Sequence, residues 1–318
     1  MTRDLSRRDL GLFLAGLASA RILNAGEASF TRAAGRVGTA RIAAGARKSV
    51  FFRAVGEAVA RSVGVATPEA AISRLVKPSD TVGIKVNCLG GPRMSPRPEV
   101  VEALVELVAG VGVERRKIVV FERLSRELEN AGFTLYRNRG PYRCFGIDND
   151  YEREPTVAGS VGSCFARLVT TTCTALISVG VVKDHDFAGI SAGLKNWYGV
   201  IHNPNKYHDG NCDPYVADVV RSPFIGSKLR LTVLDGARAQ YRGGPAFARR
   251  GVFDLGLVAA STDPVAADAW AWKEIDLERG RHGLPTLEEQ GRPPRFIATA
   301  HRYGLGQGER KALQVIAG

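Results

Sequence analysis

Apolar residues along the chain follow two alternating patterns, one with helical spacing and one in short apolar runs. Phe52, Val55 and Val59 recur every three or four positions, which predicts a helix over residues 51–63. Residues 80–87 form a short apolar run between turn signals, which predicts a strand. The other predicted helices span residues 68–75, 99–109, 122–131, 214–220, 264–273 and 296–303. The other predicted strands span residues 117–121, 132–136, 175–181, 229–234 and 255–260.

The order of these elements indicates the fold class. Strand 80–87, helix 99–109 and strand 117–121 form a βαβ unit, which predicts an α/β fold with a mainly parallel sheet and helices on both faces. Such sheets bind ligands at the carboxyl ends of their strands. The loops that we expect to line one pocket there follow Asn87, Val181, Leu234 and Ala260.

The N-terminus has the order of an export signal, with basic residues, an apolar run and then small residues. Arg7 and Arg8 follow a serine, the apolar run ends at Leu17, and residues 18–20 offer a cleavage site. The adjacent arginines resemble the twin-arginine signal. That resemblance implies that the twin-arginine export machinery carries the folded protein out of the cytoplasm. A basic amphipathic helix at the terminus is the alternative.

Three parts of the chain are therefore expected. Residues 1–25 would be the signal peptide, residues 26–47 a linker rich in Ala, Gly and Arg, and residues 48–318 a single α/β domain. The apolar run of the signal is too short to span a bilayer, so we expect no stable membrane span after cleavage. The mature protein would be periplasmic or secreted.

Charge and cysteine content narrow the classes of partner. A net charge of +12 is compatible with nucleic acid, an acidic substrate or an anionic membrane surface. The basic residues are scattered and lack interleaved aromatic residues, which argues against nucleic-acid binding. The five cysteines contain no C-x-x-C pair, which argues against a zinc ribbon or an iron–sulfur cluster. One disulfide or buried thiols both remain open.

One polar stretch, residues 183–215, carries three of the five histidines. Buried polar groups are unfavourable unless they find partners, so this concentration is typical of a site rather than of a core. His202, His208 and Cys212 are candidate ligands of a transition metal or metal-bearing cofactor. His185 is a candidate acid/base group or ligand. Hydrogen-bonded structural histidines are the alternative.

Basic and amide side chains near the predicted strand ends could hold an anion. Lys85, Asn87, Arg93 and Lys183 are the candidates for a carboxylate or phosphate site. Lys195 is a candidate anchor for a substrate or cofactor. Solvated surface lysines are the alternative for Lys183 and Lys195.

Four segments resemble an uncharacterised bacterial and archaeal family, domain of unknown function 362. They span residues 82–87, 183–196, 235–238 and 260–268. The resemblance implies the fold of that family but no reaction. Some members carry added ferredoxin modules, whose cysteines this chain lacks.

A second, more distant resemblance concerns the nickel-pincer lactate racemase family. The motif from His185 to Lys195 looks like that family's, which implies an acid/base histidine and a lysine that tethers the cofactor. Where that family has a second acid/base histidine, this sequence has Glu122. Where it has a metal-ligating histidine, this sequence has Asn211, three residues after His208.

Two functions follow as hypotheses. The first is an exported enzyme, dependent on a metal or metal-bearing cofactor, with acid/base or redox chemistry on a small anionic molecule. The second is a non-catalytic periplasmic module that binds a metal, cofactor or anion for a larger complex. Convergence of His185 and Lys195 with Asn87 and Asp235 in a deep pocket would favour the enzyme. A shallow, open cluster would favour the binding module.

Overall fold

The structure is a computed structural model that describes residues 32–42 and 46–318, so the predicted signal peptide lies outside the described residues. The strands are β1 (Arg36–Arg41), β2 (Val82–Val86), β3 (Ile118–Glu122), β4 (Arg143–Gly146), β5 (Thr156–Ala158), β6 (Val161–Ser163), β7 (Ala175–His185), β8 (Gly189–Ser191), β9 (Leu229–Gln240), β10 (Val252–Phe253), β11 (Leu257–Ser261) and β12 (Gln314–Ile316). The α-helices are α2 (Lys48–Val63), α3 (Pro68–Leu75), α4 (Pro98–Gly110), α5 (Ser125–Asn130), α6 (Asp209–Cys212), α7 (Tyr215–Arg221), α8 (Pro264–Arg281) and α9 (Arg295–Arg302).

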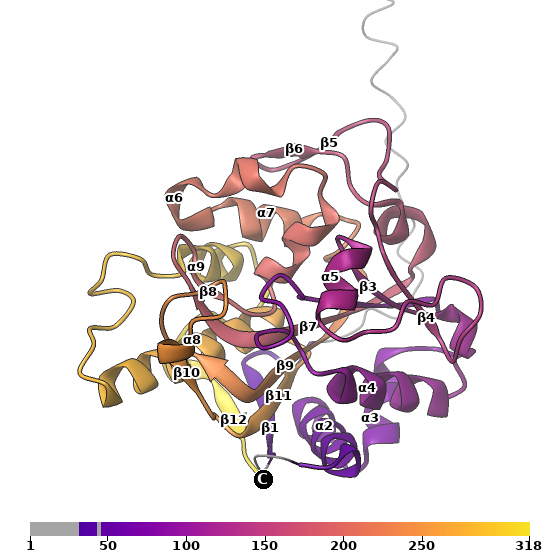
Figure 1. Ribbon diagram of the computed structural model, residues 1–318, viewed down its shortest axis with the longest axis horizontal. Coiled ribbons are helices and arrows are strands. Elements are labelled where there is room, and N and C mark those ends of the chain that lie inside the picture. Colours follow the sequence, from indigo (N-terminus) through magenta and orange to yellow (C-terminus); the bar gives the residue numbers. More distant parts are fainter. Residues whose placement is uncertain (1–31, 43–45) are drawn as a thin grey trace, which may run out of the picture. The chain divides into compact units, whose positions relative to one another are not determined.

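A ten-stranded sheet forms the centre of residues 32–318 (Figure 1). Its strand order is β12-β1-β11-β9-β7-β2-β3-β4, with β8 added to β7 and β10 to β9. Strands β9, β7, β2, β3 and β4 run parallel, whereas β11 pairs antiparallel with β9 and β1. The predicted α/β fold with a mainly parallel sheet is confirmed.

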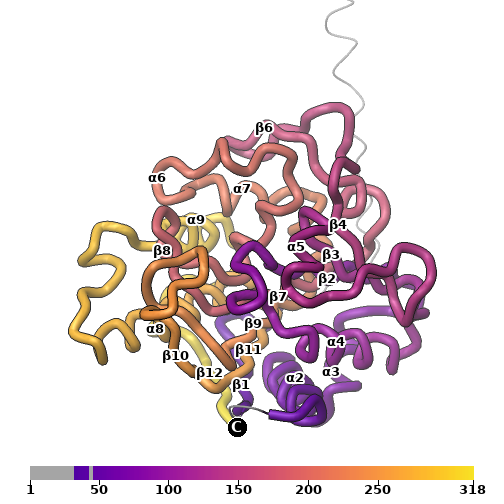
Figure 2. The backbone as a smooth tube through the Cα atoms, viewed as in Figure 1, coloured from indigo at the N-terminus to yellow at the C-terminus, as the bar shows by residue number. Residues whose placement is uncertain are grey.

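Helices cover both faces of this sheet. Every residue of β2, β3 and β7 is buried, which requires cover on both faces. Helices α2, α3 and α4 pack on one another, and α8 packs on α9 (Figure 2). Both α2 and α8 also contact β1 and β11. The central strands are therefore core elements, and their ends are the places left for polar chemistry.

Two predicted helix starts are confirmed by their caps. The hydroxyl of Thr67 accepts a hydrogen bond from the backbone N–H of Ala70 at the start of α3. The carboxylate of Asp263 accepts from Val265 and Ala266 at the start of α8. Helix α8 continues past the predicted end at residue 273, to Arg281.

The linker predicted for residues 26–47 is wrong over residues 36–41, which form β1 inside the sheet. Small residues there permit close packing rather than flexibility. A Cβ atom on Gly38 would lie 2.2 Å from the carbonyl oxygen of Ala58, so the missing side chain lets α2 approach the strand.

The strand predicted over residues 132–136 is also wrong. Only Tyr136 pairs there, in an isolated bridge to Cys144, and the edge of the sheet is formed by β4 instead. The apolar residues of that segment serve packing, since Phe133 is buried without belonging to a strand. An apolar run alone does not distinguish the two.

The described residues contain no membrane-spanning helix and no disulfide. Within 32–42 and 46–318, no helix combines the length and the apolar character that crossing a bilayer requires. All five cysteines are free thiols, so the structure forms no disulfide from them. Four of the five are buried, which matches the alternative of buried thiols.

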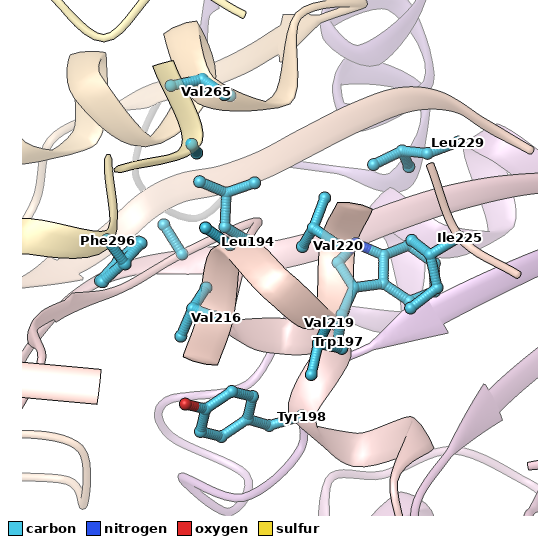
Figure 3. Packing of buried hydrophobic residues seen from close by; sticks show 14 of the residues in the cluster. Leu194, Trp197, Tyr198, Val216, Val219, Val220, Ile225, Leu229, Val265 and Phe296 are labelled. Carbon is cyan, nitrogen blue, oxygen red and sulfur yellow. The ribbon is translucent and has the colours of Figure 1, made fainter. Parts of the chain in front are cut away.

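A hydrophobic cluster lies directly behind the polar stretch singled out in the sequence. Leu194 and Trp197, at a 3₁₀ turn over Lys195–Val200, pack against Val216 and Val220 of α7 (Figure 3). Both Leu194 and Trp197 are fully buried. Burial of such side chains contributes about 1.5–3 kcal/mol each, which fixes the backbone that carries Lys195.

Candidate functional site

A cavity of about 500 Å³ lies at the carboxyl ends of β2, β3 and β7. The residues that line it are Lys85, Asn87, Leu89, Glu122, Arg123, Glu127, Lys183, His185, Phe187, Ser191, Lys195, Asn196, Tyr198, Gly199, Pro204, Asn205, His208 and Pro245. The cavity therefore lies at strand carboxyl ends, as predicted. Of the four loops predicted to line it, however, the loop after Ala260 contributes no residue to this lining.

Strand β7 carries two of the cavity's basic side chains, because they lie on the same face of the strand. We predicted that this strand ends at residue 181, but it continues to His185 and pairs with β8. Because side chains alternate along a strand, Lys183 and His185 face the cavity together. Asp184 between them accepts a hydrogen bond from the backbone N–H of Gly244. The polar stretch begins inside the sheet and not in a loop.

Six of the nine predicted site residues line the cavity, namely Lys85, Asn87, Lys183, His185, Lys195 and His208. Arg93 lies elsewhere, exposed and stacked over the ring of Phe247 at 4.0 Å. It lines a separate small hollow with Asp235, which is buried and accepts from the backbone N–H of Arg97. The prediction that Arg93 holds an anion at this cavity is therefore wrong, and Asp235 does not converge there with His185 and Lys195.

The predicted metal-ligand set is not brought together. His202 is exposed and lies edge-on against Tyr151, outside the cavity lining. Cys212 is fully buried, and burial raises the pKa of its thiol. Across residues 32–42 and 46–318, no group of three His, Cys, Asp or Glu side chains is arranged to hold a metal ion. His202, His208 and Cys212 do not form the predicted site because the loop between them turns His202 away.

A buried ion pair forms one wall. The Lys85 ammonium lies 2.5 Å from Glu122 and donates to Asn196 at 3.1 Å. Glu122 also accepts the backbone N–H groups of Cys88 and Arg123. Its charge is thus fully engaged, and it neutralises Lys85. Glu122 was not among the predicted site residues, although its place at the end of a strand is a signal for one.

Lys183 is a buried cation without an acidic partner among the ion pairs of the described residues. Its ammonium donates to the backbone carbonyl of Met94 at 3.3 Å. Burial and, to a smaller extent, the nearby charge of Lys195 lower the pKa of Lys183 to about 8. A bound anion would remove the main cause of this lowering, since it would replace the lost solvation.

Lys195 is the second buried lysine of the cavity that has no acidic partner among the ion pairs of the described residues. Its Nζ lies 3.2 Å from Nε2 of His208 and 4.6 Å from the ring centre of Tyr198. No ion pair of the described part of the chain involves it, and burial lowers its pKa. Nδ1 of His208 faces the carbonyl of Asn205 at 3.4 Å, which assigns the proton of a neutral ring to Nδ1. Nε2 of His208 is then the acceptor for Lys195.

His185 has the opposite tautomer. Its Nδ1 accepts hydrogen bonds from the backbone N–H groups of Phe187 at 3.2 Å and Ala188 at 3.3 Å. The proton of the neutral ring is therefore on Nε2. Burial lowers the pKa of His185 to about 2, assisted by Lys195 and His208. The ring is a neutral hydrogen-bond donor at physiological pH.

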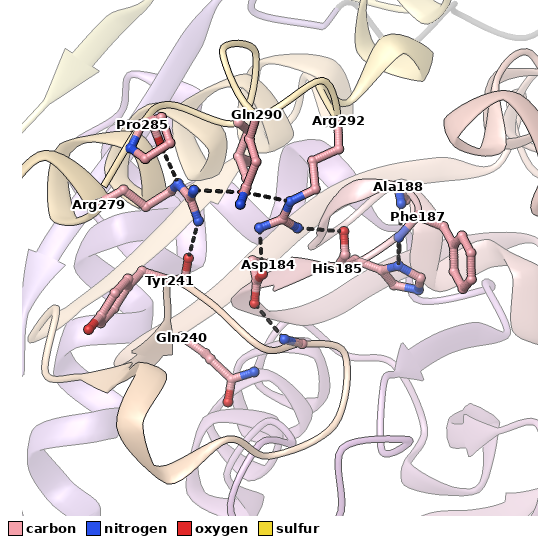
Figure 4. A network of polar contacts seen from close by, with 12 residues as sticks. Asp184, His185, Phe187, Ala188, Gln240, Tyr241, Arg279, Pro285, Gln290 and Arg292 are labelled. Atoms are coloured by element: carbon pink, nitrogen blue, oxygen red, sulfur yellow. Dashed lines mark hydrogen bonds and ion pairs between the residues drawn. The ribbon is translucent and has the colours of Figure 1, made fainter. Parts of the chain in front are cut away.

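The rings of the two histidines lie side by side, and the backbone of His185 is fixed by hydrogen bonds. Their rings stack at 6.0 Å between centres. Arg292 donates to the backbone carbonyl of His185 at 3.1 Å and to Asp184 at 3.2 Å (Figure 4). Arg279, fully buried, holds the same loop through the side chain of Gln290 at 2.8 Å. The roles of Arg279 and Arg292 were not predicted, because both residues are more than 90 positions from His185 along the chain.

Comparisons with known proteins were made for the whole chain. The model of the family described as "Domain of unknown function (DUF362)" matches residues 82–273. A crystal structure of a Thermotoga maritima protein from a structural genomics consortium is similar at 10% identity with a TM-score of 0.41. That match covers 74% of this chain and 59% of the other. A search of curated proteins finds no significant match. The export signal and the likeness to lactate racemases stay predictions.

Proposed function

Because the chain belongs to the family described as domain of unknown function 362, whose description supplies no reaction, we propose a function from the cavity itself: the protein is an enzyme that moves protons on a small organic anion. The observation that carries this proposal is the pairing of two buried lysines, without acidic partners among the described residues, with two histidines of opposite tautomer.

Charge balance supports an anionic ligand. Glu122 already neutralises Lys85 within the lining, which leaves the ammonium groups of Lys183 and Lys195 uncompensated by a bonded carboxylate. An unpaired buried charge is unfavourable by several kcal/mol, on the order of the desolvation penalty of one ion. A carboxylate bound between these lysines would offset that penalty. Asn87 adds a buried amide oxygen that lacks a hydrogen-bond partner and can accept from a ligand hydroxyl.

The histidine tautomers support proton transfer. Nε2–H of His185 can donate to a substrate oxygen on which negative charge develops, and the ring does not need a second proton to do so. Lys195, whose pKa is lowered, loses its proton more readily than an exposed lysine. As the free amine it no longer pairs with the carboxylate and can remove a proton from the neighbouring carbon. The ammonium so formed donates to Nε2 of His208. Lys183 holds the carboxylate throughout.

A metal-bearing organic cofactor is compatible with one residue of this set. Lys195 is buried in the cavity, and no carboxylate of the described residues pairs with it, so its amine is suited to a covalent anchor. Such a group would supply hydride or electron transfer when bound. The roles of Lys183 and His185 as anion holder and hydrogen-bond donor do not depend on it.

The test is exchange of carbon-bound protons. Organic acids incubated with the protein in D₂O should incorporate deuterium next to the carboxylate, as measured by NMR. Lys195→Met should lower the exchange rate about 100-fold or more, the usual size of an acid/base contribution. Lys77→Met removes an exposed lysine distant from the lining and should leave the rate unchanged. Binding of acids without any exchange would favour the non-catalytic module instead.

Export through the twin-arginine machinery is part of the same proposal. Its support is the order of residues at the N-terminus, which lies outside the described residues. Replacing Arg7 and Arg8 with lysine should retain the protein in the cytoplasm, as cell fractionation would measure. Equal periplasmic amounts of variant and wild type would overturn this part and leave the enzymatic part intact.

A further inference from the structure

The cavity combines a cationic floor with an apolar opening. Leu89 and Phe187 both line it, yet their side chains are 64% and 61% exposed. The ammonium-bearing side chains of Lys183 and Lys195 are 1% and 8% exposed. Residues that are exposed and also line a cavity lie at its opening, whereas the two lysines lie at its floor. Leu89 follows β2, which carries Lys85, and Phe187 follows β7, which carries Lys183.

The opening is continuous with the reactive groups. The ring of Phe187 lies 6.3 Å from the ring of His185 and 6.3 Å from that of His208, between ring centres. Pro204 and Pro245 extend the same apolar lining. An apolar chain that starts at the floor would therefore run along the histidines and emerge beside Phe187.

The size of the cavity sets a lower limit on its ligand. About 500 Å³ lies in the range of roughly 300–1,000 Å³ typical of sites that enclose a drug-sized ligand. A two- or three-carbon acid would leave most of this space to water beside apolar side chains. Large exposed apolar residues at a cavity opening are themselves a sign of a binding surface.

We propose that the ligand of this cavity is an amphipathic organic acid, whose carboxylate binds between Lys183 and Lys195 and whose apolar chain lies against Leu89 and Phe187. This inference rests on the proposed function and specifies its substrate class. The carboxylate contributes the charge recognition, and the chain contributes apolar burial that grows with its length.

The test is a binding series with the full chain. Acetate, butanoate, hexanoate and octanoate are titrated by calorimetry. Hexylamine, which has the same number of carbon atoms as hexanoate and the opposite charge, serves as the control ligand. Affinity should rise about threefold to fourfold per methylene that becomes buried. Hexylamine should not bind, because the lysines repel it.

Variants separate the floor from the opening. Phe187→Ala should weaken hexanoate binding about tenfold and leave acetate within about twofold, since only the chain touches this residue. Val157→Ala removes another exposed apolar side chain, which is outside the lining, and should change neither affinity. Lys183→Met should weaken all the acids alike.

The outcomes distinguish the two proposals. Equal affinity for all acids, with Lys183→Met still weakening them, would overturn the amphipathic ligand and keep the anion site. Binding of none of the acids would overturn the proposed function itself. Tight binding of hexylamine would overturn the cationic floor.

Discussion

Nζ of Lys195 lies 3.2 Å from Nε2 of His208. Like Lys183 in the same cavity, Lys195 has no acidic partner among the ion pairs of the described residues. A lysine that donates to a neutral histidine keeps its full charge or loses it according to pH, because no carboxylate holds the proton. Because the pKa of Lys183 is lowered to about 8, the charge of the cavity is sensitive to mildly alkaline solution.

Anion affinity should depend on pH with a defined sign. The charged form of Lys183 binds the anion, and its pKa in the free protein is about 8. Affinity for hexanoate should be constant below that pH and fall roughly tenfold per pH unit above it, as calorimetry from pH 6 to 10 would measure. Lys77→Met, which removes an exposed lysine, should keep the wild-type profile. Constant affinity up to pH 10 would contradict a binding role for Lys183.

His185 should make the protein less stable in acid. Its folded pKa is about 2 and its unfolded pKa about 6.5, so the unfolded chain binds more protons between these values. Stability is therefore lost as pH falls below about 6.5. The loss should reach roughly 2–3 kcal/mol by pH 4.5, at 1.36 kcal/mol per unit.

Urea unfolding of wild type and His185→Asn at several pH values would measure this term by difference. The variant lacks the ring, so its stability should fall less steeply between pH 6.5 and 4.5. ¹⁵N NMR should also show His185 as a neutral ring with its proton on Nε2. Parallel pH profiles, or a proton on Nδ1, would contradict the assignment.

The sequence predicted where the site lies better than it predicted which residues form it. The apolar runs predicted the carboxyl ends of β2 and β3 to within one residue, because burial on both faces leaves a largely apolar signal there, but they ended β7 four residues early. Lys183 and His185 escaped assignment to β7, since polar residues in a fully buried strand break that signal. Their burial follows from the cavity, which no local pattern reports.

Residues that depend on long-range folding were the ones missed or misplaced. Arg93 and Asn87 follow the same strand, yet only Asn87 reaches the cavity, because the loop turns Arg93 toward Phe247. His202 and His208 are only six residues apart, yet His202 contacts Tyr151 outside the cavity and His208 contacts Lys195 inside it, for the same reason. Loop direction is set by tertiary contacts and not by spacing.

Asp268 should be required for the position of Lys195. Its fully buried carboxylate accepts hydrogen bonds from the backbone N–H groups of Gly193 at 2.7 Å and Leu194 at 3.2 Å. Burial raises its pKa to about 7. Asp268→Ala leaves two buried N–H groups without partners and should lower the free energy of unfolding by about 2–4 kcal/mol.

Asp268→Asn is the matched variant, since it keeps one acceptor oxygen and should lose less stability. Asp186→Ala, at an exposed aspartate of the same region, should change stability by no more than about 0.5 kcal/mol. Thermal or urea unfolding measures all three. An Asp268→Ala variant as stable as wild type would show that the 192–194 segment does not need this support.

The Lys85–Glu122 pair should behave as a buried ion pair and not as a surface one. Both side chains are at least 95% buried, and they lie 2.5 Å apart. Glu122→Gln keeps the shape but leaves Lys85 charged and unpaired, so it should lower the free energy of unfolding by about 3–5 kcal/mol. Glu106→Gln, in the half-exposed pair with Arg115, should change it by no more than about 1 kcal/mol.

The double variant Lys85→Met with Glu122→Gln separates charge from packing. Removing both charges takes away the unpaired cation, so the double variant should recover part of the stability that Glu122→Gln loses. Urea unfolding of the four proteins of this cycle gives the coupling free energy. A coupling near zero would mean that Asn196 and the carbonyl of Val86, which also accept from Lys85, suffice to hold its charge.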